Sequence, residues 1–482
     1  MTQLLTRAAT AAADYRRGAH LRHVGARADA ATLRERFGGE LPREPTPPGE
    51  VLSQLLAAAE DGLVATVGPR FFGLVVGGSL PAATAADLLA TGWDQCAFNA
   101  AVAPAAAAAE QVAGEWLADV LGLLEGVSVG FVTGGQAANT VGLACARHHL
   151  LAQAGWDVER DGLAGAPRVR VVACRERHAT IDASLRLLGF GTSVLEPVAA
   201  GGNGAIDIAD LERVLDRGRG PVLVCLQAGN VNTGACDDLR AACGLVREHG
   251  GWSHVDGAFG LWAAASPATA ALVDGVELAD SWACDGHKWL NVPYDSGFAF
   301  CSRPDVHAAA MSYTAAYLAG SGTGSPALGD LVPESSRRAR GFAVWAALRE
   351  LGRDGLARLV LRCHTLARRF ASALADGGAE VANDVVLNQV LVRFGNDEQT
   401  ARVIEAVQRD GTCWLGGTTW RGNRYLRIAV SNHSTTEADV DRSAAAILRC
   451  AAEVRNKVGN EAGNDVGNEV RNAAGDAPPE RP

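Results

Sequence analysis

Short apolar runs alternate with helical patterns along the chain from about Val127. Six of these runs predict strands, and they lie at 127–133, 168–174, 221–227, 252–256, 281–285 and 297–301. Helical periodicity follows the first three strands, at 136–154, from about Ile181, and at 237–248. Parallel strands need crossover connections, which are usually helices. The alternation therefore predicts an α/β fold with a mainly parallel sheet that is covered by helices.

The pattern changes after about Arg337. Helical stretches near 337–352 and 354–377 precede the apolar run VVLNQVLVRF, a helical stretch near 399–409, the run YLRIAVS and a last helix to about Val454. This order predicts a smaller α+β domain. The final segment repeats Gly, Asn and acidic residues with few large apolar side chains, so we expect disorder there. The predicted parts are an N-terminal helical arm at 1–75, a large domain at 76–336, a small C-terminal α+β domain at 337–455 and a disordered tail at 456–482.

Composition excludes several classes of function. Hydrophobic residues make up 48% and charged residues 20% of the 482 residues, which is typical of a soluble globular protein. The net charge of −10, without a basic cluster, argues against nucleic acid as a partner. We find no secretory N-terminus and no apolar run of about 18 residues, so we expect neither export nor a membrane partner.

Cysteine usage points to a reducing compartment. The 11 cysteines are scattered and form no CxxC pair, so we expect a cytoplasmic protein with mostly buried thiols. We expect no metal site. The one local cluster, Cys145, His148 and His149, has no further ligands in a recognisable spacing, and helix packing explains it better.

Lysine is rare in this chain, and that makes Lys288 a candidate for chemistry. Of the 44 basic Lys and Arg residues only Lys288 and Lys457 are lysines. A guanidinium stays protonated, whereas a desolvated ammonium can lose its proton and attack a carbonyl. Lys288 is therefore predicted to form an imine with a carbonyl compound. The alternative is a structural lysine whose stem is buried and whose charge pairs with Asp285.

Four strand ends carry residues that could hold one cofactor. The turn GGQAAN at 134–139 can bind an anion, and His178 follows the second strand. Asp256 ends the strand WSHVD and precedes small residues, and His287 stands beside Lys288. Each has an ordinary structural explanation, such as a turn, an edge histidine or a helix cap. Together they are the groups that pyridoxal 5'-phosphate needs, and ligands of such sheets bind beyond the carboxyl ends of strands.

The same segments resemble a known family. FVTGGQAAN, RERHATIDASLRLLGFG, LQAGNVNTGACDDL, WSHVDGAFG and DGHKWLNVPYDSG are similar, in order and spacing, to the group II pyridoxal-phosphate-dependent decarboxylases. That family includes aromatic-amino-acid, glutamate and diaminobutyrate decarboxylases. The resemblance covers roughly 50–454. It implies the aspartate-aminotransferase-like fold, which is fold type I of the pyridoxal-phosphate-dependent transferases, with a seven-stranded sheet, a pyridoxal-phosphate-binding large domain and a homodimer.

The resemblance also implies roles for individual residues. Lys288 corresponds to the imine-forming lysine and Asp256 to the partner of the pyridine nitrogen, while Ala258 and His178 correspond to the residues on the two faces of the ring. The other implied cofactor residues are Gly135, Gln136, Asn230 and His287. Candidates for the substrate are Arg427, Asn99 and Tyr317, and Arg427 could equally form a structural salt bridge.

The implied reaction is decarboxylation of an L-amino acid to the corresponding amine. Related decarboxylases have a tyrosine late in the loop at about 312–336, whereas this chain has only the early Tyr313 and Tyr317. Transamination, aldol-type cleavage and oxygen-dependent aldehyde formation therefore stay open, as does a non-catalytic protein that binds pyridoxal phosphate. The sequence does not identify which amino acid is the substrate.

Overall fold

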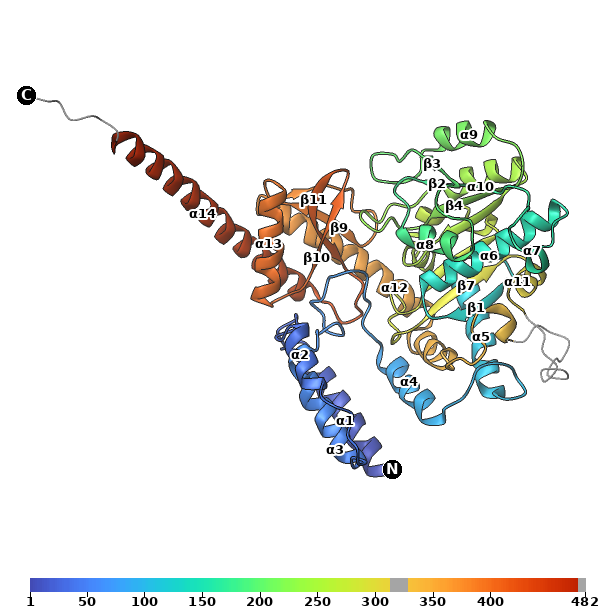
Figure 1. Cartoon of the computed structure of the whole chain (residues 1–482), viewed down its shortest axis with the longest axis horizontal. Coiled ribbons are helices and arrows are strands. Elements are labelled where there is room, and N and C mark those ends of the chain that lie inside the picture. The colour runs from blue at the N-terminus through green and yellow to red at the C-terminus, as the bar shows by residue number, and fades with distance from the viewer. Residues whose placement is uncertain (313–327, 476–482) are drawn as a thin grey trace, which may run out of the picture.

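A seven-stranded sheet forms the centre of the larger domain (Figure 1). The computed structural model describes residues 1–312 and 328–475 of the chain. β7 runs antiparallel to both of its neighbours, and every other neighbouring pair is parallel, which confirms the predicted mainly parallel sheet. The strands lie in the order β1 (Ser128–Val132), β7 (Gly297–Cys301), β6 (Ser281–Asp285), β5 (Trp252–Asp256), β4 (Val222–Gln227), β2 (Arg170–Cys174) and β3 (Leu195–Val198).

β3 is the strand that the hydrophobic pattern does not predict. Its sequence is LEPV, and of its four residues only Val198 is fully buried. An edge strand has one neighbour and less cover, so a charged residue and a proline are tolerated in it. The six strands predicted from their apolar runs are all present.

Helices cover both faces of the sheet, because alternate strand residues point to opposite sides. Along β2, Val171 and Ala173 pack in one apolar cluster, and Val172 and Cys174 pack in another. The double cover explains why these strands are continuous apolar runs. The first cluster includes α6 (Gly135–Gln153), α7 (Val158–Asp161), α8 (Ala179–Leu187) and α11 (Pro304–Met311), and the second includes α5 (Pro104–Val120), α9 (Ile208–Asp216) and α10 (Leu239–Glu248).

The smaller domain contains a four-stranded antiparallel sheet. Its order is β10 (Gly416–Trp420), β11 (Asn423–Ala429), β9 (Gln389–Arg393) and β8 (Glu380–Val381). The helices α12 (Gly341–Asp376) and α13 (Asp397–Asp410) pack on this sheet, and α14 (Glu437–Gly475) packs on both helices.

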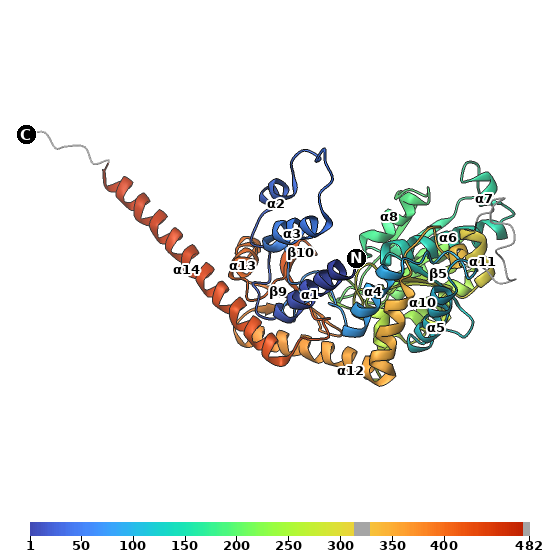
Figure 2. The ribbon, with the colours of Figure 1, turned by 90° about the horizontal axis from the view of Figure 1, so that it is seen from below.

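The helix α12 connects the two domains (Figure 2). Its first part packs on α4 and α5 of the larger domain, and its second part packs on β8 and β9. At Gly352 the backbone has φ 58° and ψ 179°, which interrupts the helix. The break lies between the two helices that the sequence predicts, and glycine adopts this left-handed region without the steric cost of a side chain.

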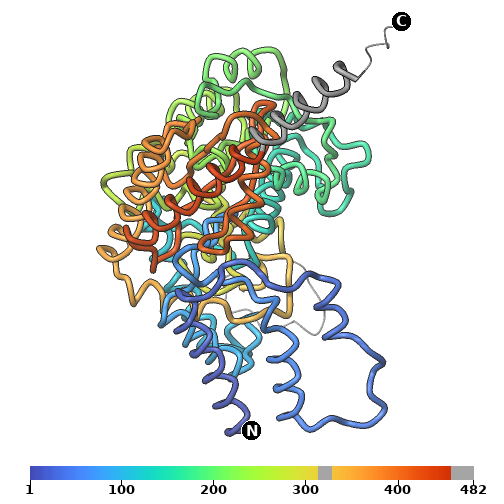
Figure 3. The backbone as a smooth tube through the Cα atoms, turned by 90° about the vertical axis from the view of Figure 1, so that its left-hand side faces the viewer, coloured from blue at the N-terminus to red at the C-terminus, as the bar shows by residue number. Residues whose placement is uncertain are grey.

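The N-terminal segment lies beside the smaller domain (Figures 1 and 3). Its helices are α1 (Thr2–Gly18), α2 (Ala30–Phe37) and α3 (Pro48–Ala59), and α4 (Pro81–Trp93) leads from it into the larger domain. The Val24 N–H donates to the Gly411 carbonyl at 2.9 Å, and so joins the segment to the loop after α13.

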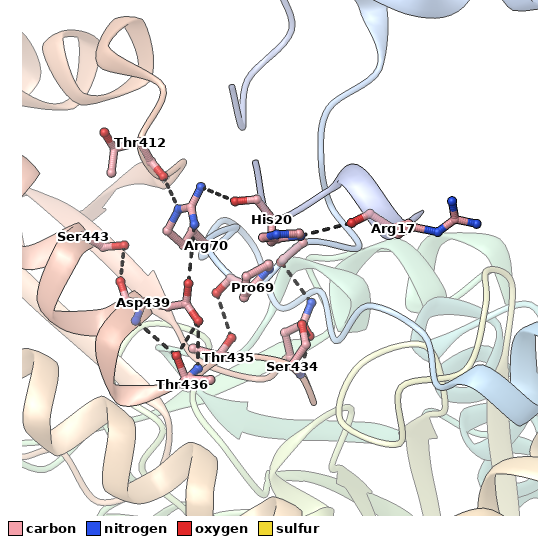
Figure 4. Close-up of polar contacts among 12 residues, drawn as sticks. Arg17, His20, Pro69, Arg70, Thr412, Ser434, Thr435, Thr436, Asp439 and Ser443 are labelled. Atoms are coloured by element: carbon pink, nitrogen blue, oxygen red, sulfur yellow. Dashed lines mark hydrogen bonds and ion pairs between the residues drawn. The ribbon is translucent and has the colours of Figure 1, made fainter. Parts of the chain in front are cut away.

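Arg70 forms a second contact between the N-terminal segment and the smaller domain (Figure 4). Its side chain is buried, with Nε donating to the Thr412 carbonyl at 2.7 Å and Nη2 donating to the His20 carbonyl at 2.9 Å. Nη1 lies 3.4 Å from Asp439 Oδ1 at the start of α14. The planar guanidinium therefore holds three distant chain segments with one side chain.

The end of α14 is helical, whereas the sequence analysis predicts disorder there. The helical backbone includes residues 456–475, which the sequence analysis assigns to a disordered tail, and 476–482 lie outside the described residues. Composition predicts whether a segment can bury apolar surface, whereas a helix that has already formed can lengthen without a new nucleus. Among the described residues, we find no helix long and apolar enough for a membrane span.

Candidate active site

The ends of four strands meet at one edge of the larger sheet. β5 ends at Asp256 and β6 at Asp285, and the two strands are parallel, with Asp256 opposite Ala283. β1 runs into the turn at Gly134, and β2 runs into the turn before His178. The edge that carries the carboxyl ends of the strands is where ligands of open α/β sheets bind.

Lys288 lies just beyond β6, and its charge faces Asp285. Lys288 Nζ is 3.0 Å from Asp285 Oδ2, and His287 Nε2 is 3.4 Å from Asp285 Oδ1. The Gly135 N–H donates to the same Oδ1 at 2.5 Å. Asp285 is almost completely buried, so one carboxylate satisfies three donors. The ion pair that the sequence left open as a structural use of Lys288 is present.

The glycine turn before α6 lies directly against the lysine turn. A Cβ at Gly134 would lie 2.9 Å from His287 Cε1, and a Cβ at Gly135 would lie 2.9 Å from Asp285 Oδ2. The Cβ of Ala258 would be 3.4 Å from the latter position. Only residues without side chains allow this close approach, which brings the N-terminus of α6 to the site. Free N–H groups at such a terminus favour an anion.

His178 caps the helix α8 at the same edge. Its Nδ1 accepts the Thr180 N–H at 3.3 Å and lies 2.9 Å from Thr180 Oγ1. Burial lowers the pKa of His178, and the positive charges of Lys288 and Arg427 lower it further, against the opposite effect of Asp256. The imidazole is therefore neutral at physiological pH. The charges of Asp256, Lys288 and Arg427 therefore all act on His178.

Asp256 is buried, and both of its carboxylate oxygens accept hydrogen bonds. Oδ2 accepts from Asn139 Nδ2 at 3.1 Å and lies 3.4 Å from Thr180 Oγ1. Oδ1 accepts from the Ala258 N–H at 3.3 Å. Every partner is a hydrogen-bond donor, which suits an ionised carboxylate that can accept one further N–H from a ligand.

The side chains of two predicted cofactor residues, Gln136 and Asn230, form hydrogen bonds within the protein. Gln136 Nε2 donates to Ser184 Oγ on α8 at 3.0 Å, so its amide points along α8. Asn230 Nδ2 donates to the Glu176 carbonyl at 3.2 Å, and its Oδ1 accepts the Asn232 N–H at 2.9 Å. These contacts hold loops next to the site.

The three predicted substrate residues lie in different places. Arg427 is on β11, donates to the Val231 carbonyl at 3.0 Å, and has a pKa lowered by burial. Asn99 Oδ1 accepts the Ala101 N–H at 3.0 Å, and Asn99 lines a cavity of about 840 Å³ whose described lining residues do not include Lys288. Tyr317 lies outside the described residues.

Sequence reasoning did not identify Asn139, His254 and Ser281 as site residues. His254 is on β5 and Ser281 is its partner on β6, and both are fully buried together with Asn139 on α6. One signal was available in the sequence. Residues two apart on a strand share a face, so His254 points to the same side as Asp256.

Comparisons with known proteins decide the family. The model of the pyridoxal-dependent decarboxylase conserved domain matches residues 32–394. The chain belongs to the pyridoxal-dependent decarboxylase family. Among its relatives, the aromatic-L-amino-acid decarboxylase of Bacillus atrophaeus is 26% identical over 446 residues, which are 88% of this chain and 90% of the relative. The 4-hydroxyphenylacetaldehyde synthase of Rhodiola rosea is 26% identical over 429 residues, which are 84% of this chain and 86% of the relative.

Solved structures agree with this assignment at the level of the fold. The crystal structure of Oryza sativa TDC with PLP and tryptamine matches with a TM-score of 0.87 at 24% identity, and the match covers 94% of this chain and 97% of the other. The predicted fold type I is therefore confirmed. As a member of the family, the protein is a carboxy-lyase that uses pyridoxal phosphate to decarboxylate an amino acid.

The residues at the sheet edge fit this cofactor. One edge of the sheet carries four matching groups. They are a lysine, a buried carboxylate, a neutral imidazole and a glycine turn at a helix N-terminus. When bound, pyridoxal phosphate supplies an aldehyde for the lysine and a ring that withdraws electrons from the bond to be broken. The fit rests on donor and acceptor types, and each type has a matching group on the cofactor.

Proposed function

We propose that this protein decarboxylates an aromatic L-amino acid to its amine, with Lys288, Asp256 and His178 as the catalytic residues. The observation that carries the proposal is the convergence of these three side chains, which stand on separate segments, at one edge of the sheet. The aromatic class is suggested by the decarboxylase of Bacillus atrophaeus, whose name states that specificity. We also infer that the protein acts in the cytoplasm as a homodimer.

Each residue has a defined task in this proposal. Lys288 would supply the amine for an imine with the cofactor aldehyde, once its ammonium has lost a proton, and Asp256 would accept the N–H of the pyridine ring. His178, as a neutral imidazole, would lie on one face of the ring, and Ala258 is small enough to leave room for a flat group on the other face. The turn at Gly134 and Gly135, at the N-terminus of α6, and His287 would hold the phosphate. Asp285 holds the ammonium of Lys288 in place, because the ion pair of 3.0 Å orients it.

Arg427 is the proposed partner of the substrate carboxylate. Its guanidinium is largely buried, and its one described hydrogen bond is to a backbone carbonyl. Within residues 1–312 and 328–457, no carboxylate oxygen pairs with Arg427. A buried cation that lacks an anion is costly unless a ligand supplies one. Its effect on the pKa of His178 indicates that it lies near the cofactor residues.

Oxygen-dependent aldehyde formation is a second candidate reaction. The loop at 312–336 has tyrosines only at 313 and 317, and one relative is named as an aldehyde synthase. In that reaction an amino acid, O2 and water give an aldehyde, CO2, ammonia and hydrogen peroxide, so the peroxide distinguishes it from simple decarboxylation.

Product analysis tests the proposal. The purified protein is incubated with pyridoxal phosphate and, separately, with tryptophan, tyrosine, phenylalanine, glutamate and diaminobutyrate, in air and without oxygen. Mass spectrometry that finds the amine of an aromatic substrate in both atmospheres supports decarboxylation. An aldehyde and equimolar peroxide that form only in air would establish the second candidate. A keto acid or a retro-aldol fragment would refute both. Light scattering measures whether the particle has twice the mass of the chain.

A further inference from the structure

A buried chain of hydrogen bonds runs from the interior of the sheet to Asp256. Trp252 Nε1 donates to Ser281 Oγ at 2.9 Å, and Ser281 Oγ lies 2.8 Å from His254 Nδ1. His254 Nε2 lies 2.9 Å from Asn139 Oδ1, and Asn139 Nδ2 donates to Asp256 Oδ2 at 3.1 Å. The first four residues are at most 1% exposed, so water does not compete for these bonds.

The two ends of this chain fix the direction of every bond in it. An indole N–H can only donate, and an ionised carboxylate can only accept. The Asn139 amide must therefore turn its NH2 group toward Asp256 and its oxygen toward His254, since the reverse would set two acceptors together. His254 then carries its proton on Nε2 and accepts the Ser281 hydroxyl at Nδ1. Burial lowers the pKa of His254 to about 3, so the imidazole stays neutral with this single proton.

Asn139 also connects the chain to His178. Its Nδ2 lies 3.1 Å from Thr180 Oγ1, and the Thr180 hydroxyl is 2.9 Å from His178 Nδ1. His178 Nδ1 accepts the Thr180 N–H at 3.3 Å, so this nitrogen carries no proton of its own. The proton of the neutral His178 then lies on Nε2, the nitrogen that is not used within the protein.

We propose that Asn139 and His254 are positioning residues that set the hydrogen-bonding state of Asp256 and His178 toward the cofactor. The buried chain holds Asp256 Oδ2 so that the carboxylate is oriented for the pyridine nitrogen, and it leaves His178 with a proton on Nε2 for use above the ring. The inference rests on the proposed roles of Asp256 and His178, and it adds two residues that do not touch the cofactor.

The packing around His254 supports its role as a positioning residue. A Cβ added at Gly142, on the neighbouring turn of α6, would lie 2.4 Å from His254 Cε1 and 2.6 Å from His254 Nδ1. Glycine inside a helix is unfavourable relative to alanine. The helix therefore carries an unfavourable residue at the place where the imidazole needs room.

The test compares substitutions of two buried histidines. His307 is also fully buried, and it lies 2.8 Å from Ser128 Oγ, but it stands on α11 away from Asp256. In each variant, titration with pyridoxal phosphate gives the Kd, and the visible absorbance of the bound imine gives the state of the cofactor. We expect His254→Phe to raise the Kd about ten-fold or more, the loss equivalent to one buried hydrogen bond, and to change the absorbance.

The expected controls separate positioning from mere stability. His307→Phe should lose stability like His254→Phe yet keep the wild-type Kd and spectrum. His254→Gln, which keeps an N–H for Asn139, should recover most of the affinity. If His254→Phe does not fold, Ser281→Ala decides the question, and it should raise the Kd by at least about three-fold. A wild-type Kd and spectrum in the folded His254→Phe protein, or in Ser281→Ala in its place, would overturn the proposal. The readout is cofactor binding, so a failure to produce amine refutes the proposed reaction and not this inference.

Discussion

Asn139 Nδ2 lies 3.1 Å from Asp256 Oδ2 and thereby joins α6 to the end of β5 across 117 positions of the chain. One helical turn before Asn139, the same helix begins at Gly135, whose N–H faces Asp285. The helix α6 therefore contacts the site at two points that are one turn apart. A shift of α6 would change the proposed phosphate turn and the support of Asp256 together.

Gly142→Ala should weaken cofactor binding, although alanine is the better helix former. The new methyl group would lie 2.4 Å from His254 Cε1, so His254 must move away from Asn139. Overpacking of this kind costs about 1–3 kcal/mol. We expect a lower melting temperature and a higher Kd for pyridoxal phosphate, measured by thermal unfolding and by absorbance titration.

Gly244→Ala is the matched control for that substitution. Gly244 is inside α10, and a Cβ there meets no atom within 4 Å. It should stabilise the protein by about 0.5–1 kcal/mol and leave the Kd unchanged. Equal effects of the two substitutions would contradict the role given to the space beside His254.

Lys288→Arg should retain the fold and abolish imine formation. Arginine can keep the ion pair with Asp285, which is 3.0 Å long in the wild type, but a guanidinium does not attack an aldehyde under these conditions. We expect loss of the visible imine absorbance and a fall in kcat of at least about 1,000-fold. Borohydride reduction followed by peptide mass spectrometry should find the cofactor on Lys288 in the wild type.

The second lysine provides the control. Lys457→Arg should keep the adduct, the absorbance and the turnover, because Lys457 stands on α14 in an exposed position. An adduct on Lys457, or turnover by the Lys288→Arg protein, would refute the assignment of Lys288.

Arg427→Gln should weaken binding of the substrate but not binding of the product amine. The product amine lacks the carboxylate that Arg427 is proposed to bind. A charged hydrogen bond contributes about 1.5–3 kcal/mol, so we expect kcat/KM to fall about 10- to 100-fold while inhibition by the amine changes less than about two-fold. Arg424→Gln, on the exposed side of the same strand, should change neither constant. A parallel loss of amine binding would show that Arg427 maintains the structure of the site.

The sequence predicts the sheet and the residues at its edge because both depend on local patterns. The six strands predicted from buried apolar runs are present, and Lys288 and Asp256 stand at the strand ends where the motifs lie. β3 was missed because its edge position permits Glu196 and Pro197. The break in α12 at Gly352 lies between the two helical stretches that the sequence predicts, near 337–352 and 354–377.

The buried support of the site could not be predicted in the same way. The contact between His254 and Asn139 spans 115 positions, and it depends on which helix packs on which strand. A single asparagine in a helix or a histidine in a strand has many ordinary uses. The parallel register that sets His254 opposite Ser281 is a property of the assembled sheet. The motif position of Gln136 predicts a phosphate contact, whereas the contact of its side chain with Ser184 depends on how α6 and α8 pack and could not be predicted.

Acid should destabilise the fold through its buried histidines. The contribution of His307 to this pH dependence can be measured by substitution. Burial lowers the pKa of His307 to about 4, whereas an unfolded histidine has a pKa of about 6.5. Between these values the unfolded chain binds a proton that the folded chain does not. Stability therefore falls as the pH drops from about 6.5 to about 4, by about 1.4 kcal/mol per pH unit for this residue.

His307→Phe removes this proton uptake, so its stability should depend less on pH. At pH 7.5 the variant should be less stable by about 1–3 kcal/mol, because the Leu331 carbonyl and Ser128 Oγ lose their partner. At pH 5.0 we expect the difference from the wild type to be smaller by about 2 kcal/mol, since 1.5 pH units of the wild-type penalty are absent. Urea unfolding of both proteins at pH 7.5, 6.0 and 5.0 measures the difference. A constant gap across this range would mean that His307 titrates alike in the folded and unfolded chains.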